Sequence, residues 1–371
     1  MALTHFYIDP SIAAASGTGT IGDPYGDIQH ALDTATAGAS GNQLNIKAGT
    51  SEILAAALSW TTFGLPAAAN PCIVRGYTTA ADDGGIGSID CAATYSLLAA
   101  TTYNNLNFID MELFNFGSAE PIKTGNYCAL INCEIHTTSH TSYIVDLLAY
   151  SIMNNCYFHT LTGAGIICIV STGSSVTNIF ADTGSTMIGG LLMNGTGGWA
   201  HNCIIKSSNS AVQYGVRANT SGIMVSNCSV YNSTAATTTG ISLIGIATKA
   251  MNNIVEGWSG VGGIGIESTA ANLSTQIMGN QIYNCTTSIS ETNPSIFKYD
   301  NVALGASAFA NPAGDDFTVG TSVKGVGYPA LIGGVAASTT FIDAGACQRE
   351  EAAAGGGGGI KLAGFGGGMI G

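Results

Sequence analysis

Apolar and polar residues alternate in short stretches that recur along most of the chain, and each stretch follows an asparagine. The first and third residues after the asparagine are mostly apolar, as in Cys133 and Ile135 after Asn132. A period of two predicts a short strand with one buried face. Nine asparagines, spaced 21–27 residues apart, start these stretches: Asn107, Asn132, Asn155, Asn178, Asn202, Asn227, Asn253, Asn280 and Asn301.

Each repeat contains two further apolar stretches. One follows a turn, as at 166–168, and a shorter one precedes the next asparagine, as at 151–153. Three short strands in about 25 residues, separated by Gly, Ser, Thr and Asn, predict an all-β parallel solenoid. We expect an N-terminal cap segment over residues 1–50, solenoid coils over 51–301, a C-terminal capping segment over 302–351 and a glycine-rich arm over 352–371.

The recurring residues predict how each coil turns and packs. Asparagine tolerates the left-handed backbone conformation of a tight bend, and stacked amides can bond along the solenoid axis. The cysteines at the first position after the asparagine are expected to pack in the core as small apolar side chains: Cys133, Cys156, Cys203 and Cys228. A disulfide ladder or a metal site is the alternative, but there is no CxxC pair and no histidine at zinc-site spacing. No metal and no cofactor are therefore expected.

Charge narrows the classes of function. Only 9% of the 371 residues are charged, 10 Lys and Arg against 23 Asp and Glu, which gives a net charge of -13. Such a chain has too few cations to neutralise a run of phosphates, so nucleic-acid binding is not expected. No apolar stretch is long enough for membrane insertion. The N-terminus lacks the charged start and apolar run of a signal peptide, so we expect either that a signal was removed or that the protein leaves its cell by another route.

Several motifs resemble those of a known family. Tyr7-Ile8-Asp9-Pro10 and the stretch 22–32 are similar to the lead-in and amphipathic cap helix of pectate-lyase-like right-handed parallel β-helices, which include phage-associated β-helix repeat proteins. The resemblance implies a single-stranded right-handed parallel β-helix with an N-terminal cap helix. The Gly-His-Gly and Arg-Ile-Lys motifs of its polygalacturonase-type members are missing, and only three arginines are present. We therefore name no catalytic residue.

The fourth position after the asparagine carries polar residues on successive coils. With Glu134, two residues before His136, this column predicts a face that could bind a glycan or perform acid–base chemistry: Glu134, His136, His159 and Asp182. The alternative is an ordinary exposed strand face that carries polar residues without a function.

The second position after the asparagine carries apolar residues where we expect solvent. An exposed apolar stripe typically marks a protein interface. We expect a subunit interface through this stripe and the C-terminal arm, formed by Tyr157, Phe180, Ile204, Ile360, Leu362 and Phe365. The alternative is a loop of the same chain that folds over the stripe.

These features favour a non-enzymatic structural protein of a bacteriophage particle, such as a capsid decoration, tail fibre or spike component. It would form a homo-oligomer, with a homotrimer favoured, and contact other particle proteins. It would lie in the virion or, alternatively, outside the cell or at a cell surface. One alternative is a carbohydrate-active β-helix enzyme, a tailspike depolymerase or a secreted polysaccharide lyase or hydrolase, that meets a host surface glycan. Another is a bacterial surface or filament-forming protein.

Overall fold

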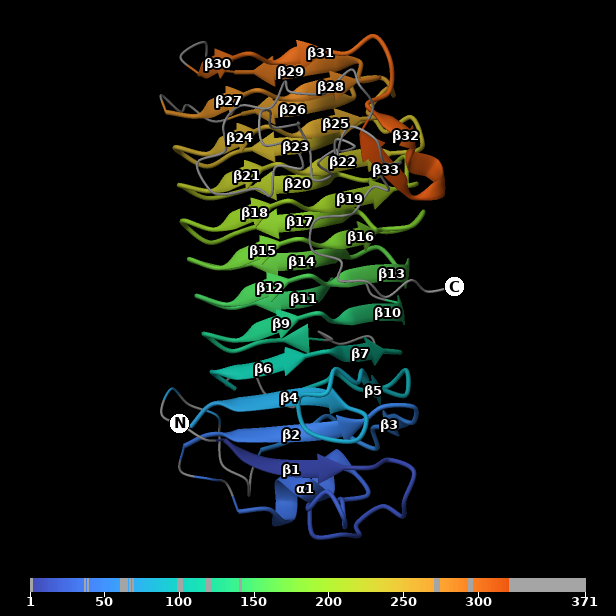
Figure 1. The fold of residues 1–371 in the computed structure, drawn as a ribbon. Coiled ribbons are helices and arrows are strands. Elements are labelled where there is room, and N and C mark those ends of the chain that lie inside the picture. Colours follow the sequence, from blue (N-terminus) through green and yellow to red (C-terminus); the bar gives the residue numbers. More distant parts are fainter. Residues whose placement is uncertain are drawn as a thin grey trace, which may run out of the picture. The chain divides into compact units, whose positions relative to one another are not determined.

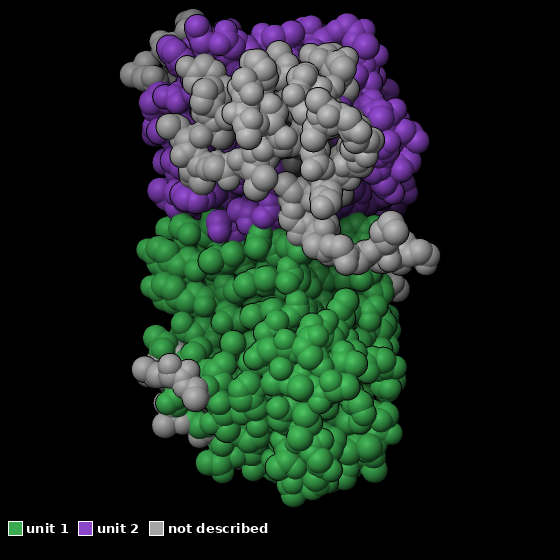
Figure 2. All heavy atoms as spheres, viewed as in Figure 1, with its two compact units in different colours: residues 1–174 green, residues 175–371 purple. Residues whose placement is uncertain are grey.

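The computed structural model describes residues 3–319, apart from 37, 39, 61–65, 67, 69, 99–102, 118–121, 140–141, 270–273 and 293–295. Short strands dominate this part of the chain, and they pair in parallel between successive turns (Figure 1). The predicted all-β parallel β-solenoid is confirmed. The chain divides into two compact units, residues 1–174 and 175–371 (Figure 2).

The first unit contains three parallel sheets. The first sheet runs β1 (Thr4–Ile8), β2 (Asn42–Lys47), β4 (Cys72–Tyr77), β6 (Leu106–Ile109), β9 (Ala129–Ile131) and β12 (Ile152–Asn154). The second runs β3 (Ser51–Ile53), β5 (Gly87–Asp90), β7 (Met111–Phe114), β10 (Glu134–Ser139) and β13 (Tyr157–Thr162). The third runs β8 (Ile122–Lys123), β11 (Tyr143–Leu147) and β14 (Ile166–Val170). Parallel pairing thus begins at β1 and β2, inside the segment predicted as a cap.

The second unit repeats this arrangement. Its first sheet runs β15 (Ser175–Thr177), β18 (Trp199–His201), β21 (Met224–Ser226), β24 (Lys249–Met251), β27 (Gln276–Met278) and β30 (Phe297–Tyr299). The second runs β16 (Phe180–Asp182), β19 (Ile204–Ser207), β22 (Ser229–Asn232), β25 (Ile254–Glu256), β28 (Gln281–Tyr283) and β31 (Val302–Ala303). The third runs β17 (Gly189–Met193), β20 (Tyr214–Ala218), β23 (Thr239–Leu243), β26 (Ile264–Ser268) and β29 (Thr287–Glu291). An antiparallel hairpin follows, formed by β32 (Phe309–Asn311), the 3-10 turn Pro312–Gly314 and β33 (Asp316–Val319).

A short helix, α1 (Ile28–Thr34), occupies the stretch where the sequence predicts an amphipathic helix. The Asp27 carboxylate accepts a hydrogen bond from the His30 amide and so caps the N-terminus of the helix. Ile28, Ala31 and Leu32 are buried. That this helix closes the end of the solenoid stays a prediction. None of the helices in the described ranges is long and apolar enough to span a membrane.

The asparagines turn the chain as predicted where the repeat is regular. Asn132, Asn155, Asn178, Asn202 and Asn227 all have positive φ, between 52° and 55°. Their amides also bond along the axis within each unit. Asn155 Nδ2 donates to Asn132 Oδ1 at 2.7 Å, and Asn202 Nδ2 donates to Asn178 Oδ1 at 2.6 Å.

Four of the nine predicted repeat starts are wrong. The left-handed residues at those turns are not Asn107, Asn253, Asn280 and Asn301 but Asp110, Asn252, Gly279 and Asp300. Aspartate and glycine also enter the left-handed region, so asparagine alone is an incomplete marker. A slip of one residue exchanges the two faces of a strand. Val255, predicted to point outward, is therefore fully buried.

The core contains the predicted cysteine column. Cys133, Cys156, Cys203 and Cys228 are free thiols and are buried. Each thiol donates a weak hydrogen bond to a backbone carbonyl, as from Cys156 Sγ to Leu130 O at 3.5 Å. Two later coils use a buried amide ladder instead, in which Asn253 donates to Asn280 at 2.9 Å and Asn280 donates to Asn301 at 2.8 Å.

Candidate functional site

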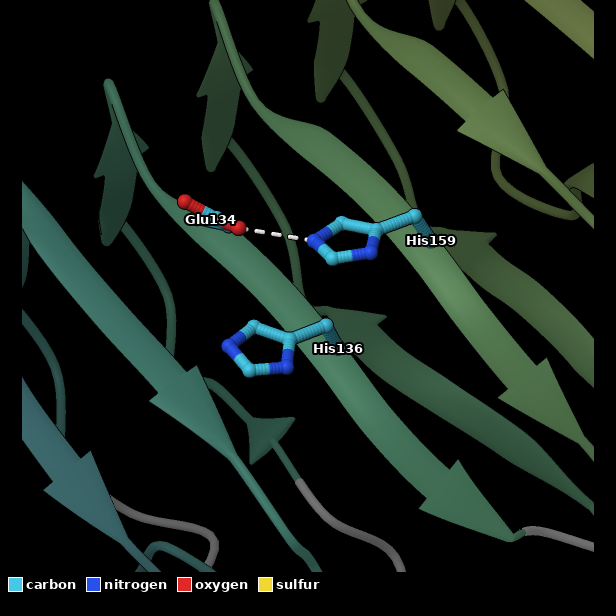
Figure 3. Close-up of side chains that lie close together, drawn as sticks. All are labelled: Glu134, His136 and His159. Carbon is cyan, nitrogen blue, oxygen red and sulfur yellow. Dashed lines mark hydrogen bonds and ion pairs between the residues drawn. The ribbon is translucent and has the colours of Figure 1, made fainter. Parts of the chain in front are cut away.

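The outer face of the second sheet of the first unit carries the candidate site. Glu134 and His136 lie on β10, and the parallel register pairs His136 with His159 on β13. Ile135, which lies between Glu134 and His136 on β10, and Phe158, which comes just before His159 on β13, are fully buried. Because side chains alternate along a strand, the buried residues turn the polar ones outward. The predicted side-by-side placement of Glu134, His136 and His159 is confirmed (Figure 3).

Two carboxylate–imidazole pairs run diagonally across this face. His159 Nε2 lies 2.7 Å from Glu134 Oε1, and His136 Nε2 lies 2.9 Å from Glu112 Oε1 on β7. In both pairs the glutamate is one coil earlier than the histidine and two positions nearer the start of its strand. The side chains are 15–33% exposed, so the pairs are half-buried and each keeps some surface in contact with solvent.

Stacked rings hold the imidazoles in place. The His136 ring lies between Phe114 and His159, with ring centroids 5.0 Å and 4.9 Å apart and interplanar angles of 3° and 15°. Tyr157 stacks on His159 with centroids 4.6 Å apart. Aromatic contacts of this kind fix the plane of an imidazole and leave its edge, which bears both nitrogens, to make polar contacts.

His159 has a polar partner on each side of its ring. Its Nδ1 lies 2.9 Å from Thr160 Oγ1, and its Nε2 faces Glu134. When Nε2 carries the proton, Glu134 accepts it in a hydrogen bond and Nδ1 accepts one from the threonine hydroxyl. The pair can therefore pass a proton between carboxylate and imidazole without moving the ring.

Asp182, the fourth residue of the predicted glycan face, is in the second unit. Its carboxylate accepts a hydrogen bond from the Gly184 amide at 2.9 Å and lies 3.4 Å from Lys206 Nζ. Burial opposes the charge of Lys206, but hydrogen bonding to Asp315 and the charge of Asp182 raise the pKa of Lys206 above its usual value. Asp182 therefore has an ion-pairing role within its own unit.

Phe180 and Ile204 are not available for the predicted subunit interface. They are only 7% and 2% exposed. Phe317 of the C-terminal hairpin packs edge-on against Phe180 and Tyr231, with centroids 6.0 Å away in each case. The alternative prediction, a segment of the same chain folded over the stripe, is confirmed at this point. Tyr157 instead stacks on His159, and Ile360, Leu362 and Phe365 lie outside the described residues.

The sequence reasoning missed Glu112 and Phe114. The register places Glu112 beside Glu134 and Phe114 beside His136. Asp110 takes the place of the repeat asparagine in this coil, and its carboxylate accepts a hydrogen bond from Asn132 Nδ2 at 2.9 Å. A search that allowed aspartate at the turn would have brought both residues into the aligned columns.

Comparisons with known proteins concern the fold. No protein-family model and no curated protein matches the chain. Among solved structures, pectate lyase Pel9A is similar with a TM-score of 0.49 and 12% identity, over 94% of this chain and 97% of that one. The A-module of the mannuronan C-5 epimerase AlgE4 from Azotobacter vinelandii gives 0.44 and 11%, over 80% and 94%. A rhamnogalacturonan lyase gives 0.38 and 12%, over 80% and 73%.

These neighbours are pectate-lyase-like parallel β-helix proteins, the kind that the sequence motifs resemble. They also correct the expected function. The leading expectation, a non-enzymatic structural protein of a phage particle, has no counterpart among these neighbours, which are named as two lyases and an epimerase, and it is not retained. The carbohydrate-active alternative is the one retained. At this level of identity the likeness speaks for the fold, so the activity has to be argued from the side chains. The predicted homotrimer and the location in a virion or at a cell surface stay predictions.

Proposed function

We propose that the protein is a carbohydrate-active enzyme whose site is the face of the first unit formed by Glu112, Glu134, His136 and His159. The observation that carries the proposal is the diagonal repeat of two carboxylate–imidazole pairs, at 2.9 Å and 2.7 Å, on successive coils. A positioned acid and base within hydrogen-bond reach of each other is the basic equipment for proton transfer to and from a sugar.

Within each pair, the two residues orient each other and can transfer a proton. Each glutamate accepts a hydrogen bond from the histidine Nε2 and stabilises the imidazolium that forms when the ring takes a proton. The histidine in turn holds the carboxylate toward the outer face. A substrate hydroxyl or ring proton that reaches the exposed edge of either pair meets a group able to accept it, while the second pair lies one coil away to return a proton.

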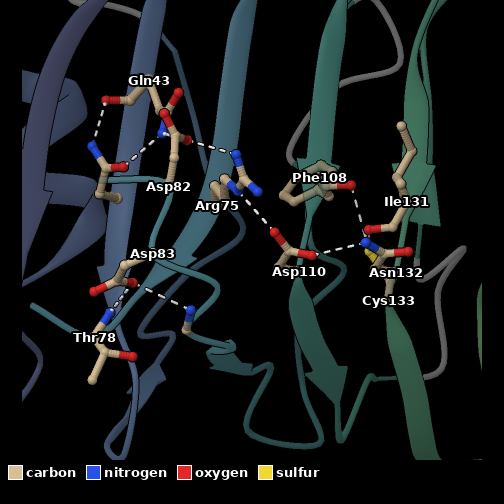
Figure 4. A network of polar contacts seen from close by, with 12 residues as sticks. Gln43, Arg75, Thr78, Asp82, Asp83, Phe108, Asp110, Ile131, Asn132 and Cys133 are labelled. Atoms are coloured by element: carbon tan, nitrogen blue, oxygen red, sulfur yellow. Dashed lines mark hydrogen bonds and ion pairs between the residues drawn. The ribbon is translucent and has the colours of Figure 1, made fainter. Parts of the chain in front are cut away.

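The surroundings favour a neutral glycan. Phe114 and Tyr157 are half-buried and give flat apolar surfaces against which a sugar ring can stack. The three cations of the first unit have other partners or places. Arg75 is held by Asp82 at 2.5 Å and Asp110 at 2.8 Å (Figure 4), and Lys47 is held by Asp9 at 2.6 Å. Lys123 lies on β8 in the third sheet. Within the described part of the first unit, an anionic sugar at this face would therefore meet carboxylates without a balancing arginine or lysine.

The test is a panel of neutral and uronate-containing polysaccharides, assayed for new reducing ends and for unsaturated products. We expect turnover of a neutral polysaccharide and a loss of at least about 100-fold in Glu134→Gln. Glu256→Gln is the matched control, because Glu256 lies on the second sheet of the other unit, 5% exposed and hydrogen-bonded to Ser307. Equal turnover by Glu134→Gln and the native chain would place the chemistry elsewhere.

A further inference from the structure

Glu134, His136 and His159 also have the composition and spacing of metal ligands. One ligand atom from each residue lies within 4.8 Å of the others, and all three residues are partly exposed. Glu134 and His136 leave the same strand on the same face, and His159 lies on the next coil, so the three side chains lie close together (Figure 3). To bring the three atoms to one ion, at least one imidazole has to turn out of the stack of His136 on His159.

The histidines are oriented as metal ligands usually are. A ligating imidazole commonly uses one nitrogen for the metal and has its other nitrogen bonded to a hydroxyl, carbonyl or carboxylate. Thr160 Oγ1 lies 2.9 Å from His159 Nδ1, which leaves Nε2 on the side of Glu134. Glu112 lies 2.9 Å from His136 Nε2, and the stack on Phe114 fixes the plane of that ring.

The donor set selects the class of ion. Two imidazoles and one carboxylate suit first-row divalent ions such as Zn²⁺, whereas Ca²⁺ and Mg²⁺ prefer oxygen ligands alone. Three protein ligands leave at least one coordination position for water or another oxygen, as in catalytic rather than structural zinc sites.

We propose that Glu134, His136 and His159 bind a divalent transition metal ion, with Thr160 and Glu112 orienting the two imidazoles. The ion replaces the hydrogen bond between Glu134 and His159, because the imidazole lone pair and the carboxylate oxygen can hold either the proton or the metal. The metal-bound state and the proton-transferring state therefore exclude each other at these two residues. Binding of the ion does not depend on any glycan being a substrate.

The test uses the full chain, free of any affinity tag and treated with a chelator. Zn²⁺ alone is titrated by calorimetry, and Co²⁺ alone is followed by its visible spectrum, which distinguishes nitrogen and oxygen ligands from thiolates. We expect one equivalent of each ion, a Co²⁺ spectrum without thiolate bands, and affinity at least about tenfold lower in His159→Gln and in Glu134→Gln.

Two controls separate this site from other ligands. His201→Gln changes a histidine of the second unit that bonds to Ser226 at 3.0 Å, and it should leave the stoichiometry and affinity unchanged. Cys285→Ser is the second control, because Cys285 is less buried than the other described cysteines. Burial raises the pKa of its thiol to about 11, so this variant, too, should leave the stoichiometry and affinity unchanged. Circular dichroism checks that each variant is folded.

The outcomes are distinct for the two proposals. Absence of Zn²⁺ binding, or equal binding by the native chain, His159→Gln and Glu134→Gln, overturns the metal site and leaves the glycan proposal standing. Tight binding by the native chain with no turnover of any polysaccharide supports the metal site and counts against the glycan proposal.

Discussion

Outward-facing side chains of the second sheet differ in exposure between the two units. In the first unit, β7, β10 and β13 present Glu112, Glu134, His136 and His159, with side chains 15–33% exposed. In the second, Phe180, Ile204 and Tyr231 of the same two columns are at most 9% exposed, and Asp182 beside them pairs with Lys206. The backbone registers are alike, so the difference comes from the side chains and from what covers them.

The cover in the second unit is the C-terminal hairpin. Phe309 and Phe317 pack edge-on with centroids 5.1 Å apart, and Asp315 bonds to Lys206 Nζ at 2.5 Å. An apolar outer face thus recruits a segment from more than a hundred residues away, whereas a polar outer face stays available to a ligand. The repeat pattern specifies the coil, whereas the residues at its outward positions can form either an apolar face that another segment covers or a polar face that stays exposed.

The largest expected effect comes from uncovering the hairpin face. Phe317→Ala should weaken the docking of β32–β33 by about 3–5 kcal/mol, because the ring is 3% exposed and packs against Phe180, Tyr231 and Phe309. Hydrogen exchange of the hairpin amides measures the loss. Phe114→Ala, on the open face of the first unit, should cost less than half as much. Equal losses would mean that the two faces are not differently covered.

The stability of the first unit should depend on pH through one buried carboxylate, Glu52. Burial, assisted by the charge of Asp27 and opposed by the Ile28 amide, raises the pKa of Glu52 to about 7 from 4.5. The folded state then binds more protons than the unfolded state, so its stability is greatest below pH 4.5 and falls as the pH rises to about 7.

Glu52→Gln should remove this dependence and stabilise the first unit by about 3 kcal/mol at pH 8. Urea unfolding at several pH values tests it. Glu256→Gln should act in the same direction in the second unit, since burial also raises the pKa of Glu256. A Glu52→Gln variant whose stability still fell between pH 4.5 and 7 would show that another group is responsible.

The turns should behave alike in the two units. Asn132→Ala and Asn202→Ala should each cost about 1–2 kcal/mol, because alanine resists the φ values of 54° and 55° and breaks the amide ladder. Shifts of the urea midpoint measure the loss. Glycine at the same positions accepts the φ and loses only the ladder, so it should cost less. Alanine and glycine variants of equal stability would count against backbone strain as the cause.

The smallest expected effect is that of the candidate site on stability. Glu134→Gln should change the free energy of unfolding by less than about 1 kcal/mol, because the pair with His159 is half-exposed and solvent screens it. The same variant is expected to lose turnover and metal affinity. A loss of stability much larger than this in urea unfolding would make the pair a structural one.

Much of the site could be read from the alternating pattern. Counting from Asn132 and Asn155 places His136 beside His159, and the structure agrees. Glu112 could not be found from Asn107, because the turn before it uses Asp110. The pairing of Glu134 with His159 rather than with His136 was also beyond the pattern, since a diagonal contact depends on side-chain rotamers and on the twist of the sheet.

The solenoid, the left-handed asparagine turns and the buried cysteine column could be predicted from the sequence, because they follow from local conformational preference and from burial at a period of two. Which outward face is covered and which is open could not be predicted in this way. That choice depends on where a distant hairpin docks and on which carboxylate reaches which imidazole across neighbouring coils, and neither is encoded in the spacing of one repeat.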